Sequence, residues 1–133
     1  MCGFSGFFTS NTLLNNQDEV LRGMASVITH RGPDDSGTWY DAQSGIGLAH
    51  TRLSIVDLSP AGHQPMHSAC ERFVIAFNGE IYNHLTLRHQ LEAQRQAPAW
   101  RGHSDTETLL ACFATWGIEK TLQATVGMFA LAL

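Results

Sequence analysis

Met1-Cys2-Gly3-Phe4-Ser5-Gly6 opens the chain and places a cysteine directly after the initiator methionine. If an aminopeptidase removes Met1, Cys2 carries both a thiol and a free α-amine, so that one residue holds a nucleophile and a base. In model peptides the thiol titrates near ~8.5 and the α-amine near ~7.7–8.0, which brings both close to a working state at neutral pH. The stretch therefore indicates an N-terminal nucleophile, and the alternative is that Cys2 is only an early residue of a β-strand.

Length and composition restrict the class of protein. The 133 residues suffice for one domain with a sizeable core, and 44% hydrophobic against 15% charged residues indicates a globular chain. A net charge of −4 without a basic run argues against a nucleic-acid partner. The sequence has neither an apolar stretch of the ~18 residues that span a membrane nor a signal-peptide pattern, so a cytoplasmic protein without membrane contact is expected. Cys2, Cys70 and Cys112 lack metal-ligand spacing, so neither a disulfide framework nor a metal site is expected.

Hydrophobic periodicity predicts alternating strands and helices. The helix over residues 17–29 is expected to bury Val20, Met24, Val27 and Ile28, which recur at helical spacing. Residues 72–77 contain a continuous apolar run from Phe73 to Phe77, which is typical of a central strand, and Asn78-Gly79 is expected to end it. Ser104 with Glu107 forms a capping-box pattern in front of a further helix that ends near Gly117. The remaining predicted strands are 2–9, 38–41, 46–55 and 128–133, the remaining helices are 83–94 and 119–124, and residues 57–66 are predicted to form a loop.

Asn78-Gly79 has two interpretations. Asn-Gly after a strand is the strongest short signal for a hairpin turn. A side-chain amide and a glycine N–H at a strand end can instead both point at a carbonyl oxygen that becomes negative, which makes an oxyanion hole. The dipeptide alone does not exclude the turn.

Two charged residues are candidates for substrate binding. Arg52 can clamp a carboxylate with two parallel hydrogen bonds, although a lone arginine more often forms a surface ion pair. Asp105 can receive an ammonium group or support the terminus of its own helix.

Taken together, these segments resemble the class II glutamine amidotransferase domain of asparagine synthetases. The resemblance covers essentially the whole chain, with its motifs in the same order. It is carried by residues 2–6, His30-Arg31-Gly32-Pro33-Asp34, residues 52–57, Gly62-His63-Gln64-Pro65-Met66, Asn78 through Asn83, residues 104–107 and Gly127-Met128-Phe129-Ala130.

The resemblance implies an α+β fold of the N-terminal nucleophile hydrolase type, a four-layer sandwich of two antiparallel sheets between helical layers. It implies that glutamine is hydrolysed to glutamate and that the ammonia passes to a second active site. Cys2 then matches the nucleophile, with its α-amine as the base, and Asn78 and Gly79 match the oxyanion hole. The implied glutamine ligands are Arg52 with backbone help from Ile55 and Val56 for the carboxylate, and Glu80 and Asp105 for the amine. The loop from His30 to Asp34 receives no role beyond shaping the site.

The same resemblance implies that residues 1–133 are a partial amidotransferase domain, incomplete at the C-terminus. Further strands and a synthetase domain that uses ATP and Mg would follow it, and no cofactor is expected within the chain itself. The acceptor of the ammonia is aspartate in the leading interpretation and a sugar or surface-polysaccharide intermediate in the alternative. An interpretation of another class is an inactive glutamine-binding or interaction domain that retains Met1. Because the apolar run Gly127 to Leu133 ends the chain, self-association through a strand edge is also expected.

Overall fold

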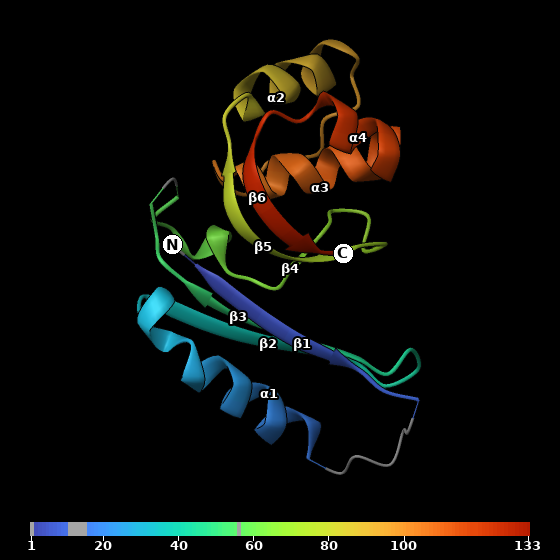
Figure 1. Ribbon diagram of the computed structural model, residues 1–133. Coiled ribbons are helices and arrows are strands. Elements are labelled where there is room, and N and C mark those ends of the chain that lie inside the picture. The colour runs from blue at the N-terminus through green and yellow to red at the C-terminus, as the bar shows by residue number, and fades with distance from the viewer. Residues whose placement is uncertain (1, 11–15, 56) are drawn as a thin grey trace.

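The computed structural model describes residues 2–10, 16–55 and 57–133. Its elements form four layers: α1, a first sheet, a second sheet, and a layer made of α2, α3 and α4 (Figure 1). Two antiparallel sheets between helical layers confirm the α+β sandwich expected from the sequence. The strands are β1 (Gly3–Phe8), β2 (Asp35–Asp41), β3 (Ile46–Arg52), β4 (Met66–His67), β5 (Val74–Ile81) and β6 (Gly127–Ala132); the helices are α1 (Gln17–Val27), α2 (His84–Ala93), α3 (Asp105–Trp116) and α4 (Ile118–Ala124), with 3-10 turns at Thr29–Arg31 and Pro60–Gly62.

The first sheet has the order β1-β3-β2, with β3 paired antiparallel on both sides. A tight turn that joins β2 to β3 ends at Gly45, whose φ of +69° favours glycine. The strand predicted over residues 46–55 ends earlier, at Arg52. Arg52 pairs with Asp35, the first residue of β2, so β3 has no partner on that side beyond this point. The chain after Arg52 therefore leaves the sheet, and this departure brings Leu53, Ile55 and Asp57 to the candidate site described below.

Helix α1 begins at Gln17 as predicted, but it turns a different stripe toward the sheet. Leu21 and Ala25 are buried, whereas Val20 is 36% exposed and Val27 is 76% exposed. The prediction that Val20 and Val27 are buried is therefore wrong. Adjacent helical positions differ by about 100° around the axis, and α1 carries two neighbouring apolar stripes. Only the packing against β3 selects the stripe that contains Leu21.

The second sheet has the order β4-β5-β6, and β5 runs through Asn78-Gly79 to Ile81. The predicted strand end at Asn78 is therefore wrong, and the hairpin interpretation falls with it. The reason is a distant partner: Asn78 pairs with Ala130 and Gly79 with Phe129 of β6. Gly79 has a φ of +152°, and a Cβ placed there would collide with the Met128 carbonyl, so only glycine fits this pairing.

The main core lies between the second sheet and helices α2 and α3. Leu87 and Leu91 point inward from α2 and meet Leu109 and Phe113 of α3. Helix α3 begins at an N-cap in which Ser104 Oγ accepts the Glu107 N–H at 3.2 Å, which confirms the cap expected from the sequence.

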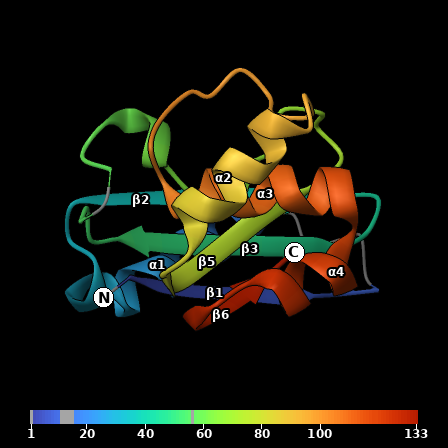
Figure 2. The same cartoon turned by 90° about the horizontal axis from the view of Figure 1, so that it is seen from above.

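The two sheets face each other, and β5 contacts both β1 and β3. Seen from above, β5 crosses over the strands of the first sheet at an angle (Figure 2). This crossing sets the start of β1 beside the middle of β5, so the first residues of the chain meet the Asn78 region.

Over the ranges that the structure describes, no helix has the length and apolar character needed to cross a membrane. In the same ranges no three His, Cys, Asp or Glu side chains are grouped so that they could hold a metal ion.

Candidate active site

A pocket opens where the two sheets meet the N-terminus of α3. Its volume is about 160 Å³, and its wall is made by the start of β1, the end of β3, the middle of β5 and the first turn of α3. Val56, one of the predicted ligands, lies outside the described residues. The structure brings the other predicted site residues together in this pocket: Cys2, Arg52, Ile55, Asn78, Gly79, Glu80 and Asp105.

Cys2 is half-buried and is fixed by contacts to both its thiol and its backbone. The Leu53 N–H donates to Cys2 Sγ at 3.4 Å, and Arg31 Nε donates to the Cys2 carbonyl at 3.0 Å. The thiol in turn donates to the Leu53 carbonyl at 3.6 Å, so both backbone groups of Leu53 contact the sulfur. The thiol is therefore held at the pocket wall by neighbours from two loops.

One oxyanion candidate, the Gly79 N–H, lies on the edge of β5 that faces away from β6. On this edge the Phe77 N–H donates to Gln64 Oε1 at 2.7 Å, and the Ile81 N–H donates to Asp105 Oδ2 at 3.0 Å. N–H groups of alternate strand residues point to the same edge, so the N–H of the intervening Gly79 also points there, toward the pocket.

The Asn78 side chain is also uncommitted. Its Oδ1 is buried without a partner, and its amide makes no hydrogen bond among the residues that the structure describes. Buried polar groups are normally hydrogen-bonded, so an uncommitted amide at a pocket wall is suited to bind something that enters the pocket. Asn78 and Gly79 thus leave two donors available at one place.

Arg52 is buried at the end of β3, with 7% of its surface exposed, and it is wrapped by the following loop. Its Nη1 donates to the Ser59 carbonyl at 2.9 Å, and its Nη2 donates to the Asp57 carbonyl. A guanidinium has five N–H donors, so donors remain for a ligand in the pocket. The surface ion pair that the sequence left open is excluded for Arg52, because its partners are carbonyls. Ile55 lies at the mouth and is 69% exposed.

Asp105 has one of the two roles that the sequence left open, the support of its own helix. Its Oδ1 accepts the Thr106 N–H at 2.9 Å, which supports the start of α3, and its Oδ2 joins that helix to Ile81. The carboxylate is buried, yet it also lines the pocket, where Glu80 is a second, more exposed acid. The pocket is thus lined by one cation, Arg52, and three acids, of which Asp57 is already bonded to Ser59 and His103. Glu80 and Asp105 then face Arg52 as a pattern complementary to a free amino acid.

Three residues that the sequence analysis left without a role support the site. Arg31 holds the Cys2 carbonyl, and Asp34 accepts the Ser54 N–H at 2.8 Å. Gln64 accepts from Phe77 and donates from Nε2 to Thr106 Oγ1 at 3.5 Å, so it joins β5 to α3. All three belong to motifs that carried the resemblance, and that membership was the available signal. The sequence could not show which backbone groups they bind.

A cysteine at the start of the first strand, at a pocket between two antiparallel sheets with helical outer layers, defines the N-terminal nucleophile hydrolase class. Comparison with known families narrows this class. The family described as glutamine amidotransferase domain matches residues 1–133, and the chain belongs to it.

Individual relatives agree with this assignment. Asparagine synthetase [glutamine-hydrolyzing] 1 of Bacillus subtilis is 40% identical over 135 residues, covering 100% of this chain and 20% of that protein. Asparagine synthetase B of Escherichia coli is 39% identical over 133 residues, covering 100% of this chain and 23% of that protein. Amidase chry2 of Gibberella zeae is 36% identical over 127 residues, covering 89% of this chain and 18% of that protein. The chain thus spans about a fifth of the length of the curated relatives that it matches.

Proposed function

We propose that this chain hydrolyses glutamine to glutamate and ammonia, and that the pocket at Cys2 is where it does so. The observation that carries the proposal is the convergence, in one pocket, of a thiol, an uncommitted amide on β5, a buried arginine and the acids Glu80 and Asp105. Glutamine has one reacting amide, one carboxylate and one ammonium group, and each of these finds a chemically matched partner there.

In the proposed reaction Cys2 Sγ attacks the side-chain carbonyl carbon of glutamine, with the Cys2 α-amine taking the thiol proton after Met1 has been removed. The oxygen that becomes negative is bound by the Asn78 amide and the Gly79 N–H. The C–N bond then breaks, the amine returns the proton to the leaving nitrogen, and ammonia departs from a thioester. Water hydrolyses the thioester, which releases glutamate and restores the thiol.

The other ligands would hold the amino-acid end of glutamine. Arg52, with the Ile55 and Val56 backbone, is assigned to the carboxylate, and Glu80 and Asp105 are assigned to the ammonium group. Opposite charges placed on either side of the α-carbon would select a zwitterionic amino acid over a simple amide.

For the whole protein we propose an amidotransferase that passes the ammonia to an acceptor activated elsewhere by ATP and Mg. Aspartate is the leading acceptor, because several relatives are named asparagine synthetases. A sugar or surface-polysaccharide acceptor is the alternative, and such an acceptor would bind outside this chain. A cytoplasmic location is supported by three free cysteines, Cys2, Cys70 and Cys112.

The test is glutamate and ammonia release by the full-length protein, with its N-terminus read by intact-mass measurement. Cys2→Ala should abolish hydrolysis and keep the fold, whereas Cys70→Ala and Cys112→Ala should keep the activity. Undiminished hydrolysis in the Cys2→Ala protein would overturn the proposal. A protein that binds glutamine, retains Met1 and shows no hydrolysis would instead support the inactive binding domain.

A further inference from the structure

Asp57 is a buried carboxylate between the two parts of the pocket that face the amino-acid end of the substrate. It lies in the loop that follows β3, and 7% of its surface is exposed. Its Oδ1 accepts the Ser59 N–H at 2.8 Å and the Ser59 hydroxyl at 2.6 Å, and its Oδ2 accepts the His103 N–H at 2.9 Å. The residue therefore bonds its own loop on one side and the segment before α3 on the other.

Asp57 thus forms a bridge between its own loop and the segment before α3, and the loop end of this bridge contacts Arg52. The Asp57 carbonyl accepts from Arg52 Nη2, and the Ser59 carbonyl accepts from Nη1 at 2.9 Å. Because the Asp57 carboxylate fixes Ser59, it also fixes the turn whose two carbonyls orient the guanidinium. A displacement of this turn would displace both bonds to Arg52 together.

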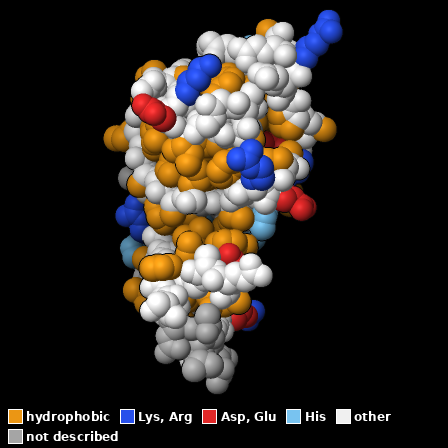
Figure 3. Space-filling view, turned by 90° about the vertical axis from the view of Figure 1, so that its right-hand side faces the viewer, with side chains coloured by type: hydrophobic (Ala, Val, Ile, Leu, Met, Phe, Trp, Pro, Cys, Tyr) orange, Lys and Arg blue, Asp and Glu red, His pale blue; other side chains and the backbone are white. Residues whose placement is uncertain are grey.

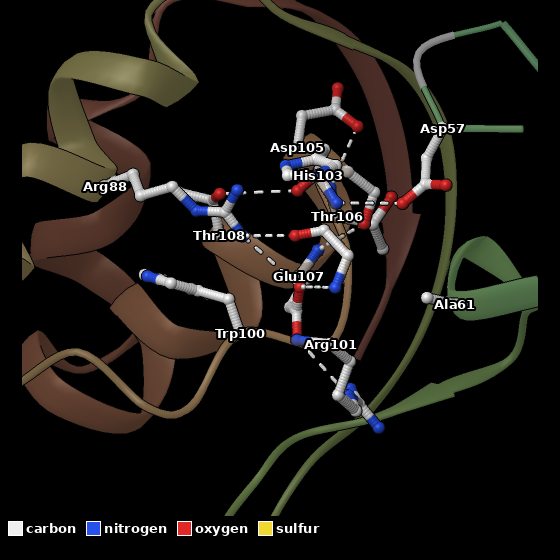
Figure 4. A network of polar contacts seen from close by, with 12 residues as sticks. Asp57, Ala61, Arg88, Trp100, Arg101, His103, Asp105, Thr106, Glu107 and Thr108 are labelled. Carbon is white, nitrogen blue, oxygen red and sulfur yellow. Dashed lines mark hydrogen bonds and ion pairs between the residues drawn. The ribbon is translucent and has the colours of Figure 1, made fainter. Parts of the chain in front are cut away.

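The helix side of the bridge is rigid and leads to Asp105. Glu107 accepts the Arg101 N–H at 2.8 Å and the Gly102 N–H at 3.1 Å, while Arg88 donates to the Gly102 carbonyl at 2.9 Å (Figure 4). His103 follows directly and precedes the N-cap of α3. The segment from Arg101 to His103, to which Asp57 bonds, is thus also fixed by Glu107 and Arg88. Because it leads directly into the N-cap, its position sets that of the first turn of α3.

Asp57 is suited to this role because it is charged. Burial raises its pKa, but hydrogen bonds from Ser59 and the His103 backbone outweigh burial and hold the pKa below its usual range. Hydrogen bonds to a charged acceptor are stronger than those to a neutral one. Packing agrees with the geometry, because a Cβ at Gly102 would collide with Asp57 Oδ2.

We propose that Asp57 is a positioning residue that fixes Arg52 relative to Asp105 and so sets the affinity for the amino-acid end of the substrate. The proposal rests on the proposed function. The carboxylate and ammonium groups of glutamine share one carbon atom, so their partners must keep one separation. Arg52 ends a strand of the first sheet and Asp105 begins a helix above the second, and Asp57 bonds the surroundings of both.

The chain offers a matched control for the test. Asp41 accepts the Gln43 N–H at 3.0 Å and the Ser44 hydroxyl at 2.7 Å, so its carboxylate stabilises a turn much as Asp57 does. It is the last residue of β2, directly before the β2–β3 turn, and lacks a bond to the α3 segment. Asp57→Asn should raise the KM for glutamine about 10-fold to 100-fold, as expected for a substrate partner displaced by a fraction of an ångström to 1 Å, with kcat within about twofold. Asp41→Asn should change neither constant.

A second readout separates positioning from general loss of structure. In a Cys2→Ala background, calorimetry gives the Kd of glutamine and of 4-carbamoylbutanoate, which is glutamine without its α-amine. Without the Asp57 bridge the site cannot engage both charged groups at once, so the ratio of the two Kd values should fall toward 1 in Asp57→Asn. An unchanged ratio, with both Kd values raised equally, would mean that Asp57 is only structural and would overturn the inference.

Gly102→Ala provides the same test with all side-chain charges retained, since its Cβ pushes against Asp57 Oδ2. Gly23→Ala is its control, because a Cβ there meets nothing within 4 Å. If the wild type and both controls hydrolyse glutamine while Asp57→Asn and Gly102→Ala match them in KM, the inference fails and the proposed function stands. Absence of hydrolysis and of glutamine binding in the wild type would overturn both.

Discussion

His50 and Phe77 connect the two sheets through one hydrogen bond. His50 Nε2 lies 3.0 Å from the Phe77 carbonyl oxygen, so β3 of the first sheet bonds β5 of the second. A carbonyl only accepts, which requires the proton on Nε2 and leaves Nδ1, buried and without a partner in the described structure, as the unprotonated nitrogen. Because Phe77 directly precedes Asn78, this bond also helps to fix the position of the candidate oxyanion donors relative to the first sheet.

This burial predicts a pH dependence of stability. Burial lowers the pKa of His50, more than its bond to Phe77 and the charge of Asp35 raise it. The ordinary pKa of histidine is ~6.5, so as the pH falls below that value the unfolded state takes up the proton first and stability decreases until the lower folded-state pKa is passed. Urea unfolding from pH 8 to pH 5 should show this decrease.

The same titration in His50→Gln should have a smaller slope, because the amide cannot titrate. His89→Gln is the control, since the His89 side chain is 78% exposed. Equal slopes for wild type and His50→Gln would show that His50 does not carry the effect.

Asn78→Ala should lower kcat for glutamine hydrolysis by about 10²–10³-fold, as removal of one oxyanion donor does elsewhere, while the KM changes little. The melting temperature should also change little, because the Asn78 side chain has no hydrogen-bond partner among the described residues. Steady-state kinetics and thermal melting measure both quantities. A kcat within twofold of the wild type would remove Asn78 from the oxyanion hole.

Arg52→Lys should raise the KM for glutamine more than tenfold, because lysine cannot present the planar pair of donors that matches a carboxylate. The structure adds a stability cost, since Arg52 donates to the Asp57 and Ser59 carbonyls and lysine would lose at least one of these bonds. We expect the free energy of unfolding to decrease by about 1 kcal/mol. Steady-state kinetics would measure the rise in KM, and urea unfolding would measure the loss of stability. An unchanged KM would mean that another residue binds the substrate carboxylate.

The 133-residue chain by itself should self-associate. Strand β6 is an edge of the second sheet as described, and Val126, Met128 and Leu133 are 57%, 67% and 41% exposed. Figure 3 shows hydrophobic side chains gathered on the face that lies on the right in Figure 1. Exposed strand edges and apolar patches recruit partners.

Ala130→Lys should shift this chain toward monomer in size-exclusion chromatography, because a charge on an edge strand opposes pairing. Ala42→Lys, in the exposed β2–β3 turn, carries the same charge and should leave the association unchanged. A wild-type chain that elutes as a monomer at all concentrations would contradict the prediction.

The sequence by itself determined the local features of the fold. The helical spacing of apolar residues after residue 17 placed α1, Ser104 placed the cap of α3, and the apolar run before Asn78 placed the buried strand. Each of these signals acts through backbone groups within a few residues, so no distant partner was needed to read them. The resemblance that these motifs carry also selected Cys2, Arg52 and the other predicted residues that line the pocket, but it gave no roles to the supporting residues.

The tertiary structure alone decided what depends on partners far along the chain. Asn78-Gly79 favours a turn locally, yet it continues a strand because β6, about 50 residues later, pairs with it. Leu21 rather than Val20 is buried because β3 selects one of two apolar stripes. Asp57 became a candidate positioning residue only when folding brought its carboxylate to the His103 N–H, 46 residues away in sequence, since a hydrogen bond acts over about 3 Å of space whatever the separation along the chain.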